Sequence, residues 1–146
     1  MASHYLTFSA GITLSFYYIK LNKYIGLIGV VPAIVFHLPY FFCLSAAHSS
    51  WTYTDFTLMF MGGLLLGSSI RDFSNSMRIS LFILYMIGDT LLAVLFVIGS
   101  PLYSSQVIPF SPYSPGQFLD TGILMFGVMN TILAYILIYF FRKLAI

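Results

Sequence analysis

Five long runs of apolar residues, separated by short breaks where polar residues gather, dominate the sequence. Because a helix rises about 1.5 Å per residue, about 20 apolar residues are needed to cross a hydrocarbon core of about 30 Å. The pattern predicts an all-α integral membrane protein, a bundle of five transmembrane helices in a single domain covering 1–146. The predicted spans are 2–19, 24–47, 54–70, 79–100 and 116–141.

Prolines and glycines within two of these runs change the helices expected there. Pro32 and Pro39 remove backbone donors from the second span, so kinks are expected near its middle and in its outer half. Gly63 and Gly67 stand four residues apart in the third span. This spacing lets another helix approach closely, so we expect a helix-packing face that meets a neighbouring subunit.

The basic residues predict how the chain is oriented. All six fall in three pairs at alternate ends of the spans: Lys20/Lys23, Arg71/Arg78 and Arg142/Lys143. Cytoplasmic loops of membrane proteins collect Lys and Arg, so the N-terminus is predicted outside and the C-terminus in the cytoplasm. Because basic residues follow the first span and none precedes it, this span is expected to be a retained helix and not a signal peptide.

The composition supports a membrane location and excludes several classes of function. The chain is 60% hydrophobic, 18% aromatic and 7% charged, and it contains no Glu. Such a chain cannot form the surface of a water-soluble domain, so a multi-pass protein of the cell membrane, in contact with lipid, is predicted. The net charge of +2 reports orientation and no nucleic-acid binding. Cys43 is the only cysteine, which excludes an internal disulfide.

Two ionisable residues fall near the predicted midplane of the membrane. His37 lies in the second span and Asp89 in the fourth, so they are expected to be within reach of each other. Ionisable groups inside hydrocarbon are costly unless they are paired or hydrated. This intramembrane pair would orient an imidazole for a metal or haem, relay a proton, or hold two helices in register.

A second set of candidate residues falls on the outer side. Asp55 and Asp120 lie at predicted helix starts, where capping is the simplest interpretation, and His48 and His4 lie on the same side. The residues considered for a metal site are His37, Asp55, Asp120 and His48. Because no two His or Cys share the spacing of one helix face, the metal signal is weak.

The outer connection PLYSSQVIPFSPYSP, at 101–115, contains four prolines, three aromatic residues and no charge. This composition predicts an ordered cap on the membrane surface and not a mobile loop.

Two stretches carry a family resemblance. The first is Phe36-His37-Leu38-Pro39-Tyr40-Phe41, followed by Trp51 and by Gly63-Leu64-Leu65. The second is Ser100-Pro101-Leu102-Tyr103, Ser114-Pro115 and Asp120-Thr121-Gly122-Ile123-Leu124-Met125. In order and spacing, these residues resemble the CtaG-type cytochrome oxidase assembly family and related small archaeal membrane proteins of unknown function.

The resemblance is incomplete where that family has a His-x-x-Glu-His helix start. The first histidine of the family falls on His37 and the glutamate on Asp55, but the two later histidines fall on Thr52 and Phe56. Neither of these side chains can replace an imidazole as a ligand. The resemblance therefore implies that a metal site is reduced or lost in this chain.

The resemblance implies a role beside a haem–copper oxidase of the respiratory chain. With the ligands changed, we expect a non-catalytic accessory subunit or assembly factor that packs against other integral membrane subunits. The sequence has no phosphate-binding loop, nucleophile elbow or paired catalytic carboxylates. The alternatives are an outer-face copper or haem protein using His37 and nearby Asp residues, and a small proton-coupled transporter using His37 and Asp89. No cofactor is expected for the accessory subunit.

Overall fold

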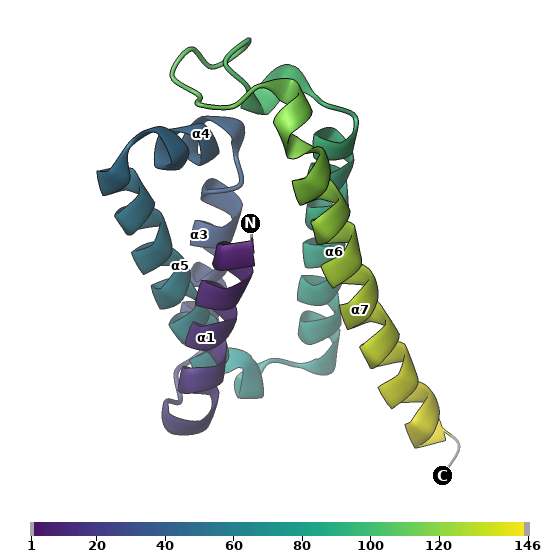
Figure 1. The fold of residues 1–146 in the computed structure, drawn as a ribbon. Coiled ribbons are helices and arrows are strands. Elements are labelled where there is room, and N and C mark those ends of the chain that lie inside the picture. Colours follow the sequence, from purple (N-terminus) through teal and green to yellow (C-terminus); the bar gives the residue numbers. More distant parts are fainter. Residues whose placement is uncertain (1, 145–146) are drawn as a thin grey trace. The chain divides into compact units, whose positions relative to one another are not determined.

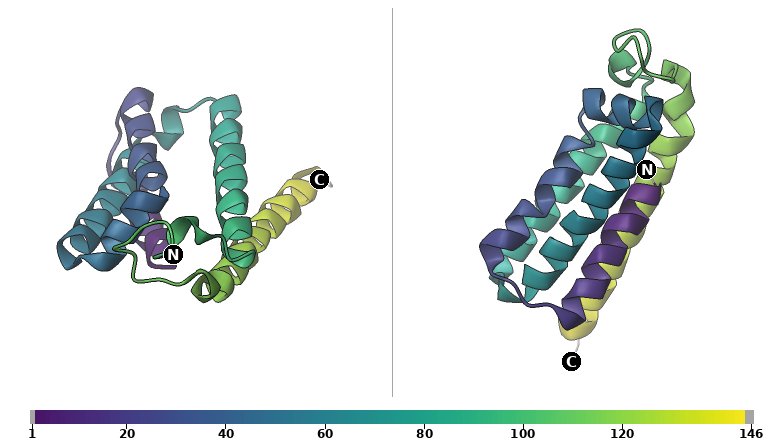
Figure 2. Two further views of the ribbon diagram at one scale, coloured as in Figure 1. Left: turned by 90° about the horizontal axis from the view of Figure 1, so that it is seen from above. Right: turned by 90° about the vertical axis from the view of Figure 1, so that its left-hand side faces the viewer.

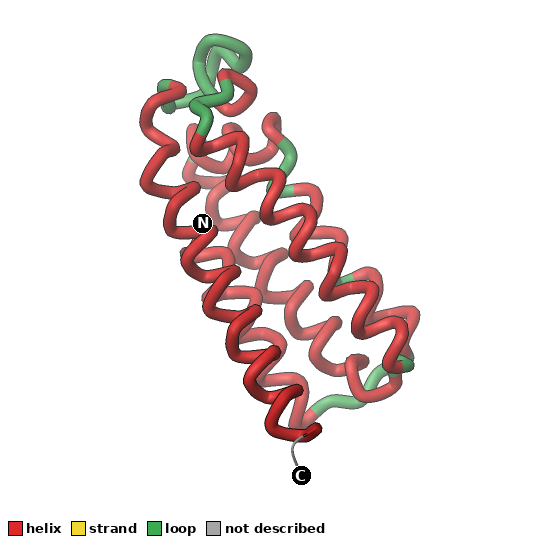
Figure 3. Tube along the Cα trace, turned by 90° about the vertical axis from the view of Figure 1, so that its right-hand side faces the viewer, coloured by secondary structure: helices red, strands yellow, loops and turns green. Residues whose placement is uncertain are grey.

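The computed structural model describes residues 2–144, which form helices joined by short turns and contain no strand (Figures 1 and 3). The chain divides into two compact units. The first extends to Ser80 and also includes Pro101–Ser114, and the second comprises Leu81–Ser100 and the residues from Pro115 onward. An all-α protein was predicted, whereas the division into two units was not.

The first unit is built around its longest helix. Its elements are α1 (Ala2–Tyr18), α2 (Lys23–Ile28), α3 (Val30–Val35), α4 (Pro39–Ala47), α5 (Ser49–Ser69) and the 3₁₀ turn η1 (Ile70–Asp72). Helix α5 contacts each of the other four helices, and α1 runs alongside it (Figure 2). This central position explains why α5 buries polar residues that would otherwise face hydrocarbon.

Glycines allow α1 and α5 to approach closely. A Cβ atom at Gly63 would clash with the carbonyl of Phe8, and a Cβ at Gly67 would clash with the carbonyl of Ile12. On α1, Gly11 meets the backbone of α5 in the same way. The packing face predicted at Gly63 and Gly67 therefore exists, but α1 of the same chain covers it. The expectation that a neighbouring subunit occupies this face was wrong.

The predicted second span, 24–47, is broken in two places. Helices α2 and α3 meet at Gly29, and the axis of Lys23–Val35 is bent by 72° from that of α4. Leu38 is extended and Pro39 is the first residue of α4, where its missing N–H has no partner to lose. The kink expected at Pro39 is confirmed. Pro32 lies in the first turn of α3 and does not interrupt this helix. The break next to it is at Gly29, the residue before α3.

Helix α5 begins earlier than expected. The predicted connection from His48 to Tyr53 is almost entirely helical, because only His48 separates α4 from α5. His48 is extended, and the hydroxyl of Thr52 donates hydrogen bonds to the carbonyls of Ser45 and His48. These local bonds satisfy backbone acceptors at the junction and let the polar start of α5 form helix.

The far end of the first unit collects basic residues. The Lys20 ammonium lies 3.3 Å from the Asp72 carboxylate, and the Arg71 guanidinium lies 4.6 Å from the centre of the Phe16 ring. Arg78 donates hydrogen bonds to the backbone carbonyls of Ile70 and Arg71 in η1. Two of the three predicted basic pairs therefore lie at one end of this unit.

The second unit consists of two long helices. Its elements are most of α6 (Asn75–Val97), the turn η3 (Pro115–Phe118) and α7 (Leu119–Leu144). The helices touch where Gly122 leaves no room for a side chain, since a Cβ there would lie 2.9 Å from the carbonyl of Ala93. Nearby, the rings of Phe96 and Phe118 stack with 4.7 Å between their centres.

The helices differ in their suitability as membrane spans. Among the described residues, Asn75–Val97 and Pro115–Tyr139 are each long and apolar enough to cross a membrane. Lys23–Val35 and Pro39–Ala47 would add a third span if the bent pair is one crossing. The protein therefore has two or three helical segments suited to a bilayer by length and composition.

Residues 101–114 form a folded cap on α4. Its first turn is η2 (Pro101–Tyr103), and the carbonyl of Tyr103 accepts hydrogen bonds from Ser111 Oγ at 2.9 Å and Cys43 Sγ at 3.1 Å. Burial, assisted by the nearby Cys43, raises the pKa of Tyr103 to about 12. Its hydroxyl thus stays protonated at neutral pH and donates to the carbonyl of His37 at 2.8 Å. The cap is ordered by these contacts, as its composition predicted.

Candidate functional site: a buried histidine–aspartate cluster

A buried ion pair joins the beginning of α1 to α5. His4 Nε2 lies 2.8 Å from Asp55 Oδ2, although the two residues are 51 positions apart in the chain. The exposed fraction is 8% for His4 and 1% for Asp55. Charges and strong dipoles are kept this far from water only when they are paired, so each side chain makes burial of the other possible.

The glycine contacts position this pair. His4 precedes Gly11 by two helical turns on α1, and Asp55 precedes Gly62 and Gly63 by the same interval on α5. Residues seven or eight positions apart lie on the same helix face. The close approach of α1 to α5 thus places the imidazole and the carboxylate opposite each other.

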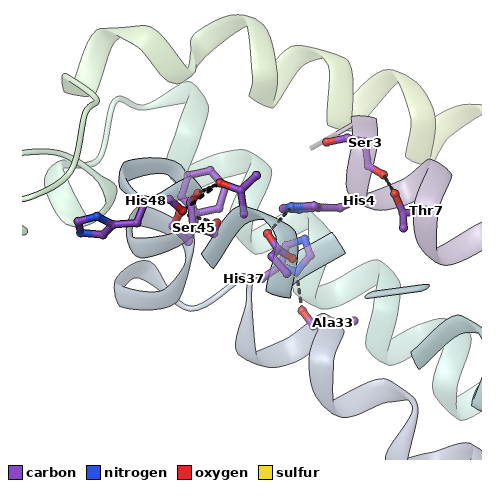
Figure 4. Close-up of polar contacts among 10 residues, drawn as sticks. Ser3, His4, Thr7, Ala33, His37, Ser45 and His48 are labelled. Carbon is purple, nitrogen blue, oxygen red and sulfur yellow. Dashed lines mark hydrogen bonds and ion pairs between the residues drawn. The ribbon is translucent and has the colours of Figure 1, made fainter. Parts of the chain in front are cut away.

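His37 adds a second imidazole beside the pair. Its ring meets that of His4 edge to face, with 5.6 Å between centres, while Phe56 contacts His4 at 5.8 Å. His37 Nδ1 is hydrogen-bonded to the carbonyl of Ala33, one turn back on α3 (Figure 4). The break between α3 and α4 thereby brings His37 into the unit beside His4.

Two polar atoms in the cluster are buried without a hydrogen-bond partner. They are His4 Nδ1 and Asp55 Oδ1, the atoms not used in the ion pair. The Nε2–Oδ2 distance of 2.8 Å is that of a hydrogen bond between the two side chains. The arrangement can therefore fix α1 against α5.

The structure corrects the interpretation of Asp55. Capping was the simplest role predicted for it, but α5 begins at Ser49 and Asp55 lies in its second turn. The polar start of the helix hid this position, because the sequence suggested that the helix began near residue 54. Asp120 lies in the first turn of α7 and is exposed, which fits a favourable interaction with the helix dipole.

The members of the predicted metal set that belong to the first unit, His37, His48 and Asp55, do not form a three-ligand group. Across residues 2–144, no three His, Cys, Asp or Glu side chains are grouped so that they could hold a metal ion. His48 is exposed between α4 and α5, and Figure 4 shows its ring directed away from His4 and His37. Asp55 is occupied by His4, and Asp120 belongs to the second unit.

The predicted His37–Asp89 pair stays a prediction. His37 belongs to the first unit and Asp89 to the second. Asp89 is buried on α6 and interacts with Tyr85, one turn earlier on that helix. A buried carboxylate in a helix of this hydropathy remains a candidate for function.

The His4–Asp55 contact was missed in the sequence, although a signal for it was present. The chain contains three His, and one of them stands two turns before a glycine in the first span. Asp55 stands in the same relation to the glycines of the third span. Matching glycine faces with polar residues at equal offsets would have indicated that these two helices pair.

Over the described residues, fold and composition define an all-helical protein with two or three segments long and apolar enough to cross a membrane, and with a buried histidine–aspartate pair. Over residues 1–143 the chain matches DUF1404, a family described as proteins of unknown function, and it belongs to that family. No curated protein and no solved structure matches the chain.

Proposed function

We propose that this protein is a non-catalytic accessory subunit or assembly factor of a membrane complex, associated with a respiratory haem–copper oxidase. In this proposal the chain crosses the cell membrane five times, with its N-terminus outside and its C-terminus in the cytoplasm. The collection of two basic pairs at one end of the first unit supports this orientation. The family resemblance of the segments around His37 and Asp120 supports the proposed association with an oxidase.

An open groove around Gly127 on α7 carries the proposal of a subunit. A Cβ at Gly127 would meet no atom within 4 Å, and the neighbouring Thr131 bonds back to the carbonyl of Gly127. The groove is lined by Ile123, Leu124, Gly127, Val128, Thr131 and Ile132. Small residues one turn apart let a second helix approach the backbone.

The contrast between the two glycine faces explains why α7 is the better docking helix. On α5, Gly63 and Gly67 are filled by the backbone of α1. On α7, no helix of the second unit packs closely against Gly127. A neighbouring membrane helix seated there would gain van der Waals contact and interhelical packing, which drive association in lipid. The protein would shape and seal the complex without chemistry of its own.

Two matched variants test the proposal. Gly127→Leu fills the groove, whereas Gly88→Leu adds the same side chain on α6 where a Cβ also meets nothing within 4 Å. Tagged wild-type protein and both variants are purified in mild detergent, and co-purifying proteins are identified together with the visible spectrum of any haem. Oxidase subunits should accompany the wild type and Gly88→Leu and be lost from Gly127→Leu. A colourless protein without partners in the wild type would contradict the proposal.

A further inference from the structure

Aromatic side chains gather at the end of the first unit opposite the basic residues. The exposed fraction is 55% for Tyr40, 38% for Trp51 and 73% for Tyr53. The Tyr40 ring packs edge to face on Phe110 of the cap, with 5.3 Å between centres. Phe41 contacts both Tyr40 and Trp51. We call Tyr40, Trp51, Tyr53 and Phe110 the aromatic rim.

The distance from this rim to the basic end matches the thickness of a bilayer core. Trp51 and Arg71 are 20 positions apart on α5 and the turn that follows it. At about 1.5 Å per residue this interval corresponds to about 30 Å, the thickness of the hydrocarbon core. Amphipathic aromatic rings favour both boundaries of that core, whereas Lys and Arg favour its cytoplasmic side.

The segments that form the rim have the composition of the headgroup region. Residues 36–53 and 101–115 contain no Lys, Arg, Asp or Glu. They contain five tyrosines and tryptophans, each of which combines an apolar body with a polar tip: Tyr40, Trp51, Tyr53, Tyr103 and Tyr113. Helix α4 turns away from α2 and α3 by 72° and crosses the top of the first unit (Figure 1). Aromatic rings with a polar tip are enriched where a membrane meets water, so a transverse segment that carries such rings fits the plane of the interface.

We propose that the aromatic rim lies in the lipid headgroup layer, with α4 and the cap resting along the outer membrane surface. The partner of this surface is therefore the bilayer and not a peripheral protein. Helix α4 then acts as a surface helix and not as the outer half of a straight second span. The inference rests on the membrane placement in the proposed function, and it is independent of the oxidase.

The chain contains its own depth probe, because Trp51 is the only tryptophan. The wild-type protein is reconstituted in phosphatidylcholine vesicles that carry nitroxide groups either near the headgroup or near the end of the acyl chain. Trp51 fluorescence should be quenched several-fold more by the shallow nitroxide. The matched control is the double variant Trp51→Phe/Met61→Trp, since Met61 is an exposed residue on the same helix. Ten positions along the helix correspond to about 15 Å, which places this tryptophan near the bilayer centre.

The wild type should be quenched more by the shallow nitroxide, and the Trp51→Phe/Met61→Trp variant more by the deep nitroxide. Stronger quenching of Trp51 by the deep nitroxide would overturn the inference, because the rim would then lie in hydrocarbon. Protection of Trp51 from both lipid nitroxides would also overturn it and would indicate burial against protein. Failure of the oxidase to co-purify leaves the quenching ratio unchanged, so the two proposals fail separately.

Discussion

At the scale of single residues, Asp55 determines how the first unit is held together. Its carboxylate is almost completely buried, one oxygen contacts His4, and the other has no partner. A buried ion pair adds little stability by itself, because desolvation offsets most of the attraction. Loss of one member is costly, since it leaves the remaining polar group unpaired in an apolar environment.

This asymmetry gives a prediction for a double-mutant cycle. His4→Leu should lower the free energy of unfolding by about 3–5 kcal/mol, because it leaves the Asp55 carboxylate buried and unpaired. His4→Leu/Asp55→Leu should recover most of that loss, since both members become apolar. Thermal unfolding in mild detergent measures all four proteins of the cycle. A double variant as unstable as the sum of the two single variants would show that the pair is not coupled.

At the scale of elements, α5 organises the first unit through its glycines. Gly62 faces Gly29 at the junction of α2 and α3, while Gly63 and Gly67 face α1. Two different faces of one helix are thus packed backbone to backbone, which leaves α5 little freedom to shift. The bend before α4 changes the direction of the chain, so that α4 contacts both α5 and the first turn of the cap.

Glycine substitutions should therefore have opposite effects on α5 and α7. Gly63→Ala places a methyl group against the Phe8 carbonyl and should destabilise the protein by about 1–3 kcal/mol through overpacking. Gly127→Ala meets no atom within 4 Å and should be neutral or stabilise by up to about 1 kcal/mol, because alanine favours helix. Unfolding midpoints in the same detergent compare the two. Equal destabilisation by both variants would contradict the packing described for α5.

At the scale of the whole molecule, the charged residues give the first unit two different ends. One end contains the Lys20–Asp72 ion pair and the Arg78 hydrogen bonds, and the other contains the uncharged cap at 101–114. The asymmetry follows the distribution expected when basic residues remain on the cytoplasmic side. It provides a direct test of the orientation in the proposed function.

Thiol labelling of intact cells checks that orientation. Gln106→Cys lies on the exposed surface of the cap, and Asn75→Cys lies at the exposed start of α6. A membrane-impermeant maleimide should label Gln106→Cys from outside and leave Asn75→Cys unlabelled until the cells are opened. The wild type serves as the background control because its single thiol, Cys43, is fully buried. Labelling of Asn75→Cys on intact cells would reverse the proposed topology.

The local features of this fold could be predicted because they depend on neighbouring residues. Apolar runs predicted the helices, Pro39 predicted the kink before α4, and the prolines of 101–115 predicted an ordered cap. The beginning of α5 was misplaced because polar Ser, Thr and Tyr residues lower its hydropathy while their backbone still forms helix. Hydropathy alone cannot distinguish a polar helical turn from a loop.

The sequence by itself determined the helical class, the membrane character and the uneven distribution of basic residues, since composition and short-range periodicity encode them. Only the tertiary structure decided that α1 fills the glycine face of α5, that His4 pairs with Asp55, and that His48 stays outside this cluster. These contacts join residues from separate helices. They depend on which helix faces meet in space, a choice made by packing across the whole unit and not by any one segment.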